Sequence, residues 1–295
     1  MTGAKDKTDK AKDKTWILRE GLFAKYVVSL VGLVVFVLAV NGAMETWISY
    51  RATKTQLTSG MEDKAQATAK RIEQSISELE RQISWVTRAS ADSLEKRRAD
   101  YAQLLNQVSA VTQLSQLNGE GREVLRVSRV SIAIGSNADL SRDARFIDTV
   151  ARGVDYAPAH FGDRGPAMSI AVAHSGFNAG VTVADIDLGF LADFLSDSQV
   201  GKIAAAYVVD PHGKVLAASS RGPETGTDLS KLPQVAAAIG SAREPASSGT
   251  DVSGHSVLAA ASAVPKLGWT VLYEQPTAQA LTPIRDQLVR AALLI

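Results

Sequence analysis

The chain has 295 residues, enough for about two domains of ordinary size. Hydrophobic residues make up 45% and charged residues 21% of it, which excludes a wholly disordered, collagen-like or polytopic membrane protein. The net charge of +1 gives no global electrostatic reason to expect nucleic acid as a partner, and the lack of cysteine excludes disulfides, iron–sulfur clusters and thiol catalysis.

An apolar segment lies near the N-terminus. Residues 26–44 contain no charged side chain, and a helix of that length crosses the hydrocarbon core of a bilayer, about 30 Å thick. Trp16, Trp47 and Tyr50 flank the segment as interfacial anchors. A buried soluble helix and a cleaved signal peptide are the alternatives, but a signal peptide is usually shorter. We expect a transmembrane helix over residues 26–48.

The charges before this segment predict its orientation. Residues 1–25 carry a surplus of three positive charges, which by the positive-inside rule keeps them in the cytoplasm. Aspartates interleave the lysines of this tail, so a solvated tail is favoured over a nucleic-acid-binding arm. We therefore expect residues 49–285 on the opposite side of the membrane from this tail.

The sequence ends on an apolar run. Residues 291–295 read AALLI, and we expect residues 286–295 to begin a second transmembrane helix. The alternative is a C-terminal helix docked on the domain.

A heptad pattern follows the first apolar segment, within a helical stalk expected over residues 49–110. The apolar positions, spaced alternately by four and three residues, are Ala65, Ala69, Ile72, Ile76, Leu79, Ile83 and Val86. No proline occurs before residue 158, so the helix can continue from the membrane to about residue 90. The stripe is either the interface of a homodimer or the face that packs on the chain's own sheet, and different segments can do each.

A first set of strands and short helices is expected over residues 111–200. A helical pattern over residues 101–108 precedes it, and Asn118-Gly119-Glu120-Gly121 is a hairpin signal. Ser141 is the expected N-cap of a helix over residues 141–151, and a second helix is expected over 188–195. The predicted strands are 111–117, 122–130, 156–161, 167–174 and 181–186.

A shorter version of the pattern is expected over residues 201–285. The predicted strands are 203–209, 214–218, 257–263 and 269–274, with a short helix over 232–239. Two successive antiparallel sheets with short helices predict an α+β fold, divided near residues 199–202.

Catalytic motifs are absent from the sequence. None of the four histidines forms an i,i+4 pair on a helix, and there is no G-x-S-x-G, Walker or G-x-G-x-x-G motif. Asp185 and Asp187 lie two apart on one strand, which would suit a metal, but such pairs are usually solvated. We therefore predict no catalytic residue, no metal and no cofactor.

A binding site for a small polar molecule is easier to support. Aromatic, cationic and anionic side chains on neighbouring strands suit such a ligand. The candidates are Arg145, Tyr156, His160, Arg164, Met168, His174 and Asp185. Asp185 is the strongest, because a carboxylate in an apolar strand needs water, a side-chain partner or a ligand. The alternative places Tyr156 and Met168 in the core, with Arg145 or Arg164 as the ion-pair partner of Asp185.

The order of elements and several local segments resemble the double Cache, PAS-like sensor domains of bacterial receptors, over residues 49–295. The segments that carry the resemblance are GREVLRVSRV (121–130), SRDARFIDTV (141–150), AGVTVADIDLGFL (179–191), AAYVVDPHGKVLAAS (205–219) and LGWTVLYEQP (267–276). The resemblance implies that the membrane-distal sheet, residues 111–200, holds the ligand, and that Asp185 contacts a ligand amine. Amino-acid-binding members carry an Arg followed by Trp-Tyr where this sequence has Arg145-Phe146-Ile147, so the ligand stays open.

The function that this resemblance implies is sensing, at the inner membrane of a bacterial cell with residues 49–285 in the periplasm. Ligand binding would shift the helices that enter the membrane and control a cytoplasmic histidine kinase that is absent from this chain. A nucleotide cyclase or a chemotaxis receptor is the alternative output. A membrane-anchored structural or adaptor protein without a ligand is the alternative of another class, and the absent motifs argue against a hydrolase.

Overall fold

A computed structural model describes residues 14–88, 93–163, 165–174, 179–196, 204–239 and 247–280. The chain divides into two compact units, Gln56–Leu281 and the remainder. Helices and two antiparallel sheets make up the described part, which confirms the α+β prediction. The tail at residues 1–13, the expected division at 199–202 and the second transmembrane helix expected at 286–295 lie outside the described residues.

Helix α1 (Lys14–Arg88) is the longest element. Its stretch Lys25–Ser49 has a mean hydropathy of 2.4 and buries none of its side chains in the molecule, so by length and composition it can cross a membrane. The absence of proline lets the helix run without a break through this stretch.

The later part of α1 belongs to the unit Gln56–Leu281, and it carries the heptad stripe. Every residue of the stripe is at most 7% exposed. The stripe joins one apolar core with residues from both sheets, such as Leu114 and Val271. Packing on the chain's own sheets is therefore the correct interpretation of positions 65–86, and the dimer interpretation is wrong for these positions because their side chains are already covered.

The first sheet contains seven antiparallel strands. They are β1 (Val111–Asn118), β2 (Glu123–Ser128), β3 (Ile132–Ile134), β4 (Val154–Tyr156), β5 (His160–Gly162), β6 (Gly165–His174) and β7 (Gly180–Asp187). The spatial order is β3-β2-β1-β7-β6-β4, and β5 also pairs with β6. The helices of this region are α2 (Leu94–Gln107), α3 (Ala144–Arg152) and α4 (Phe190–Ser196).

Two local predictions in this region need correction, and one strand was missed. The strand expected over 156–161 is two strands, because both β4 and β5 pair with β6 and Pro158, which lacks an amide hydrogen, lies between them. Asp143, not Ser141, caps α3, since its carboxylate accepts the amide hydrogen of Arg145. The exposed edge strand β3 was not predicted, because its side chains have no core to face.

The second sheet contains five antiparallel strands. They are β8 (Ala205–Val209), β9 (Val215–Ala218), β10 (Ser247–Thr250), β11 (Ser256–Val264) and β12 (Trp269–Pro276). The spatial order is β10-β11-β12-β8-β9, and β10 was not predicted because SSGT has no apolar alternation. Its helices are α5 (Pro233–Ala238) and α6 (Thr277–Ala280).

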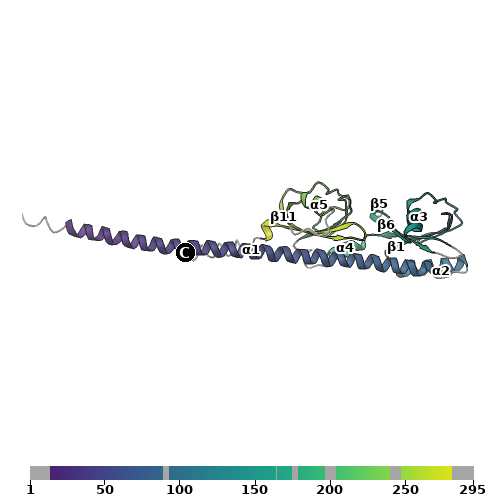
Figure 1. Cartoon of the computed structure of the whole chain (residues 1–295), viewed down its shortest axis with the longest axis horizontal. Coiled ribbons are helices and arrows are strands. Elements are labelled where there is room, and N and C mark those ends of the chain that lie inside the picture. The colour runs from purple at the N-terminus through teal and green to yellow at the C-terminus, as the bar shows by residue number, and fades with distance from the viewer. Residues whose placement is uncertain are drawn as a thin grey trace, which may run out of the picture. The chain divides into compact units, whose positions relative to one another are not determined.

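Both sheets pack one face on α1, which runs beside them in Figure 1. We call this the inner face and the opposite one the outer face. Polar contacts accompany the apolar packing: the Thr68 hydroxyl is 2.9 Å from the Tyr273 hydroxyl, and the Tyr101 hydroxyl is 2.8 Å from that of Thr182. Tyr101 belongs to α2, so α1 supports both inner faces and α2 adds support under the first sheet. The outer faces stay free for other roles.

Candidate functional site

The outer face of the first sheet carries polar side chains on its central strands. Side chains alternate along a strand, so the odd-numbered residues of β6, of β7 and of β1 from Gln113 onward share one side of the sheet. The antiparallel register places Gln113 opposite Asp185, and Asp185 opposite Ser169. One row across three strands therefore holds an amide, a carboxylate and a hydroxyl.

A pocket of about 170 Å³ lies on this outer face. It is lined by side chains of β1, β2, β7, α3 and the segment before α3. The lining residues are Gln113, Ser115, Leu117, Glu123, Arg126, Leu140, Asp143, Arg145, Phe146, Val183 and Asp185. We call it the outer-face pocket. Its mixture of apolar walls and convergent polar groups is typical of small-molecule sites.

Asp185 is half-buried in this pocket and accepts two hydrogen bonds. Gln113 Nε2 donates to Oδ2 at 3.0 Å, and Ser169 Oγ donates to Oδ1 at 2.7 Å. Neutral donors therefore hold the carboxylate in place without cancelling its charge.

Arg145 lines the same pocket but pairs with a different carboxylate. Its Nε and Nη2 donate to the two oxygens of Asp143 at 3.0 and 2.7 Å. Hydrogen bonding to Arg145 lowers the pKa of Asp143, and the same contact, with a further contribution from the charge of Asp185, raises the pKa of Arg145. The ion pair of Arg145 with Asp185, weighed from the sequence, is thus not formed.

A second ion pair lines the pocket. Arg126 Nε donates to Glu123 Oε1 at 2.7 Å, and the Ser136 hydroxyl donates to the other oxygen. Burial alone would raise the pKa of Glu123, but the bonds from Ser136, Arg126 and Ser115 outweigh it and lower that pKa. The lining therefore has three carboxylates and two guanidinium groups, and Asp185 is the carboxylate that no guanidinium contacts.

Met168 and His174 do not share the pocket. Both lie at even positions of β6, on the inner face, and Met168 is 1% exposed in the core. His174 Nε2 is buried without a hydrogen-bond partner in the described structure. Burial, together with the charge of Arg97, lowers the pKa of His174, so the ring is neutral near pH 7.

Tyr156 lies at the junction of the two sheets and not in the pocket. Its hydroxyl donates to Glu80 of α1, and Lys266, from the turn between β11 and β12, donates to the same Glu80 oxygen at 2.5 Å. Burial and the bond to Glu80 raise the pKa of Tyr156 to about 12. His160 is exposed on β5, and Arg164 lies outside the described residues.

Most of the pocket was not predicted. Gln113, Glu123, Arg126 and Asp143 reach it from β1, β2 and the start of α3. Their alternation along the sequence was visible, but it cannot show which strands become neighbours. Among the described residues, no cluster of histidine and carboxylate side chains could hold a metal ion.

Comparisons with known proteins agree on the fold. A model of the Cache domain family matches residues 49–284. No curated protein matches the chain.

Similar solved structures include the sensory domain of the Campylobacter jejuni chemoreceptor Tlp3 (CcmL) with isoleucine bound, with a TM-score of 0.62 at 12% identity over 78% of this chain and 96% of that one. The ligand-binding domain of the Pseudomonas fluorescens chemoreceptor CtaA with L-isoleucine gives 0.60 at 16% identity, over 79% and 98%. The extracellular domain of soHK1S-Z6, a proposed histidine kinase, gives 0.56 at 14% identity, over 80% and 99%. At these identities the similarity concerns the fold alone.

Proposed function

The chain belongs to the Cache domain family, and we propose that its residues 49–285 are the extracytoplasmic ligand-sensing region of a bacterial membrane receptor. The observation that carries the proposal is the outer-face pocket, in which Asp185 is held by neutral donors while each arginine is engaged by another carboxylate. Such a carboxylate is available to a positively charged or hydrogen-donating ligand group.

The proposed ligand is a small polar molecule with an amine. Its amine contacts Asp185, and a carboxylate or other acceptor approaches the guanidinium groups of Arg145 and Arg126. Phe146 and Val183 supply apolar wall for the rest of the molecule. The isoleucine bound to Tlp3 and to CtaA supports a ligand of this size and charge pattern.

The proposed route of the signal uses the two faces of the first sheet. Outer-face residues of β1 and β7 line the pocket, whereas inner-face residues of the same strands, such as Leu114 and Ala184, share the core with α1. A ligand that binds one arrangement of β1 and β7 more tightly shifts the populations of both the sheet and the helix.

The proposed output is a cytoplasmic histidine kinase. The similarity to soHK1S-Z6 supports a kinase and the similarity to Tlp3 and CtaA supports a chemoreceptor equally well; a nucleotide cyclase is the third alternative. We also keep the expectations of an inner-membrane location and of a homodimer, whose interface must lie outside the covered stripe at positions 65–86.

A thermal-shift experiment tests the ligand. The full chain in detergent is titrated with L-isoleucine, L-arginine and the other proteinogenic amino acids. An amino acid that binds the pocket should stabilise the fold by about 2.7 kcal/mol when it is present at a hundred times its Kd. Asp185→Ala should abolish this gain without unfolding the chain, whereas Val130→Ala, at an 83% exposed position, should leave it unchanged.

Two results would contradict the proposal. If no amino acid stabilises the chain, the pocket does not bind this class of ligand. The result would then favour the alternative of a membrane-anchored structural or adaptor protein without a ligand. If Asp185→Ala unfolds the chain before any addition, Asp185 holds the sheet together and is no ligand contact.

Reporter fusions test the location. A fusion at residue 120 should be active only for a reporter that works in the periplasm. Activity of a cytoplasmic reporter at that position would refute the orientation.

A further inference from the structure

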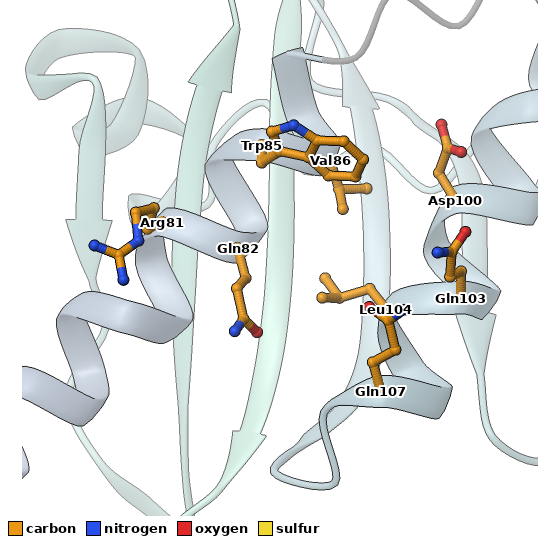
Figure 2. A pocket seen from close by; sticks show the side chains of 8 residues that line it. All are labelled: Arg81, Gln82, Trp85, Val86, Asp100, Gln103, Leu104 and Gln107. Carbon is orange, nitrogen blue, oxygen red and sulfur yellow. The ribbon is translucent and has the colours of Figure 1, made fainter.

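A second cavity lies between α1 and α2. Figure 2 shows the side chains of the two helices that line it: Arg81, Gln82, Trp85, Val86, Asp100, Gln103, Leu104 and Gln107. Its volume is about 290 Å³, against about 170 Å³ for the outer-face pocket, and the two share no lining residue. We call it the interhelical cavity.

Trp85 is the aromatic group of this cavity. Its side chain is 69% exposed, although the neighbouring Val86 is 3% exposed in the core. Figure 2 shows the indole on the α1 side and the Asp100 carboxylate on the α2 side. An indole offers a flat apolar face and one N–H donor, so it suits a ligand that has both an apolar face and polar edges.

Gln82 supplies an unsatisfied acceptor. Its Nε2 donates to Glu78 Oε1 at 2.9 Å, but its Oε1 is buried and has no hydrogen-bond partner in the described structure. This oxygen is closed off from solvent, so a ligand reaches it only if the Gln82 side chain turns toward the cavity. Such a turn would give a hydrogen donor to an oxygen whose unpartnered burial costs about 1–3 kcal/mol.

The polar groups of the lining favour a ligand with several hydroxyl groups. One cation, Arg81, and one anion, Asp100, line the cavity, and Arg81 already forms an ion pair with Glu78. Gln82, Gln103 and Gln107 add primary amides, each with donor and acceptor atoms. Hydroxyl groups donate to the Asp100 carboxylate and both donate to and accept from the amides. An ammonium would give the amide N–H groups no acceptor, and a free carboxylate would face Asp100.

We propose that the interhelical cavity binds a neutral polyhydroxylated molecule of monosaccharide size. The C–H face of the sugar ring stacks on Trp85, one hydroxyl donates to Gln82 Oε1, and the others meet Asp100, Gln103 and Gln107. The floor is the apolar surface of Val86 and Leu104, both of which belong to the core beneath the first sheet. A sugar here would therefore act on the same core as a ligand in the outer-face pocket.

Isothermal titration calorimetry of the full chain in detergent tests the proposal. The probes are D-glucose, D-galactose, D-mannose and N-acetyl-D-glucosamine, and the detergent carries no sugar headgroup. At least one probe should bind with one site per chain. Trp85→Ala should weaken that binding at least tenfold, Trp85→Phe should weaken it less, and Gln82→Leu should also weaken it.

Matched controls separate this site from the outer-face pocket. Asp185→Ala and Val130→Ala should leave the sugar affinity unchanged. The sugar proposal can therefore hold even if no amino acid binds the outer-face pocket. The proposal is overturned if none of the four sugars binds, or if Trp85→Ala binds sugar as the parent chain does. It is also overturned if the parent chain is a dimer that Trp85→Ala converts to monomer, because a second copy would then cover the cavity.

Discussion

The outer faces of the two sheets differ, although both inner faces pack on α1. On the first sheet, the outer face keeps a polar pocket beside a small apolar cluster formed by Leu117, Ala171, Val181 and Val183. On the second sheet, the equivalent face is closed: the buried side chains are Tyr207, Val209, Val215, Leu229, Val235, Ala238 and Leu272. Helix α5 contributes two of these residues and covers the face.

The buried glutamates of the two outer faces also differ, both in their partners and in the direction of their pKa shifts. Glu274 on the second sheet is 5% exposed and accepts hydrogen bonds from Tyr207 at 2.5 Å and from Gln234 at 2.8 Å. Burial raises the pKa of Glu274, despite these bonds. Glu123 on the first sheet has an arginine partner, and its pKa is lowered. The second outer face is thus a core with one acid whose pKa is raised, whereas the acid on the first outer face has a lowered pKa.

This difference shows how one architecture can serve two roles. The inner faces give both sheets their support from one helix, so the outer face of the first sheet need not be a full core. Polar side chains there reduce apolar burial but create a binding surface. The second sheet instead buries apolar side chains on its outer face.

The largest expected effect comes from breaking the support that the sheets share. Ile76 is fully buried in the core common to α1 and both sheets. Ile76→Asp should destabilise the unit by about 3–5 kcal/mol, because an unpaired carboxylate must be buried there. Urea denaturation measures this loss, and Ile83→Asp should behave alike. Ala67→Asp, at an exposed position of the same helix, is the control and should change the stability little. If Ile76→Asp and Ile83→Asp are as stable as this control, the stripe is not buried.

Shortening one valine side chain on each outer face tests whether the two faces are packed differently. Val209→Ala on the second sheet should cost about 2 kcal/mol, from two lost methyl groups and the void that they leave. Val183→Ala on the first sheet should cost less than about 1 kcal/mol, since water in the existing pocket can fill the space. Equal losses in urea denaturation would mean that the two faces are packed alike.

The two glutamates should respond to pH with opposite sign. Because the folded-state pKa of Glu274 is above the ordinary 4.5, stability falls as pH rises from 4.5 to the folded value, at up to about 1.4 kcal/mol per pH unit. Glu274→Gln, which keeps one acceptor oxygen, should therefore be more stable than the parent chain at pH 7, and the difference should vanish below about pH 4.

For Glu123 the stabilisation is present above the ordinary pKa and is lost as pH falls through the lowered folded value. Glu123→Gln should thus be less stable than the parent chain at pH 7, and this deficit should shrink in acid. Thermal denaturation between pH 3 and pH 8 measures both variants. If both variants differ from the parent chain in the same direction at pH 7, the two glutamates do not have oppositely shifted pKa values.

The smallest expected effect concerns the contact that joins the two sheets. Lys266 from the second sheet and Tyr156 from the first both donate to Glu80 of α1, and these bonds, with the charge of Lys266, lower the pKa of Glu80 against the effect of burial. A double-mutant cycle of Lys266→Met and Glu80→Gln should give a coupling of about 1 kcal/mol. The control cycle of Lys266→Met with Glu73→Gln should give none. A coupling of zero in the first cycle would mean that the ion pair does not join the sheets.

Much of the fold could be predicted because its signals are local. Every residue of the heptad stripe from Ala65 to Val86 is buried, as its period requires. The hairpin signal at residues 118–121 also holds: Gly121 has φ +76°, and Asn118 Oδ1 accepts the amide hydrogens of Glu120 and Arg122. Turn chemistry and periodicity depend on residues a few positions apart, so the sequence shows them directly.

The candidate site could be predicted only in part. Asp185 and Arg145 share a pocket, as the sequence suggested, but Met168 and His174 point to the other side of the same sheet. The alternation along a strand, which the sequence shows, tells which residues share a face of the sheet. Which of the two faces packs on α1 cannot be seen in the sequence. Tyr156 meets Glu80, a residue 76 positions away, so no local pattern could have shown its partner.

The sequence by itself determined the apolar span, the long amphipathic helix, the two antiparallel sheets and a carboxylate in an apolar strand. Only the tertiary structure decided which carboxylate each arginine engages, which outer face stays open, and that a cavity forms between α1 and α2 around Trp85. The physical reason is the range of the interactions. Periodicity and turns arise between near neighbours in the chain, whereas a pocket depends on strand pairing and packing between segments such as β1 and β7, whose paired residues Gln113 and Asp185 are 72 positions apart.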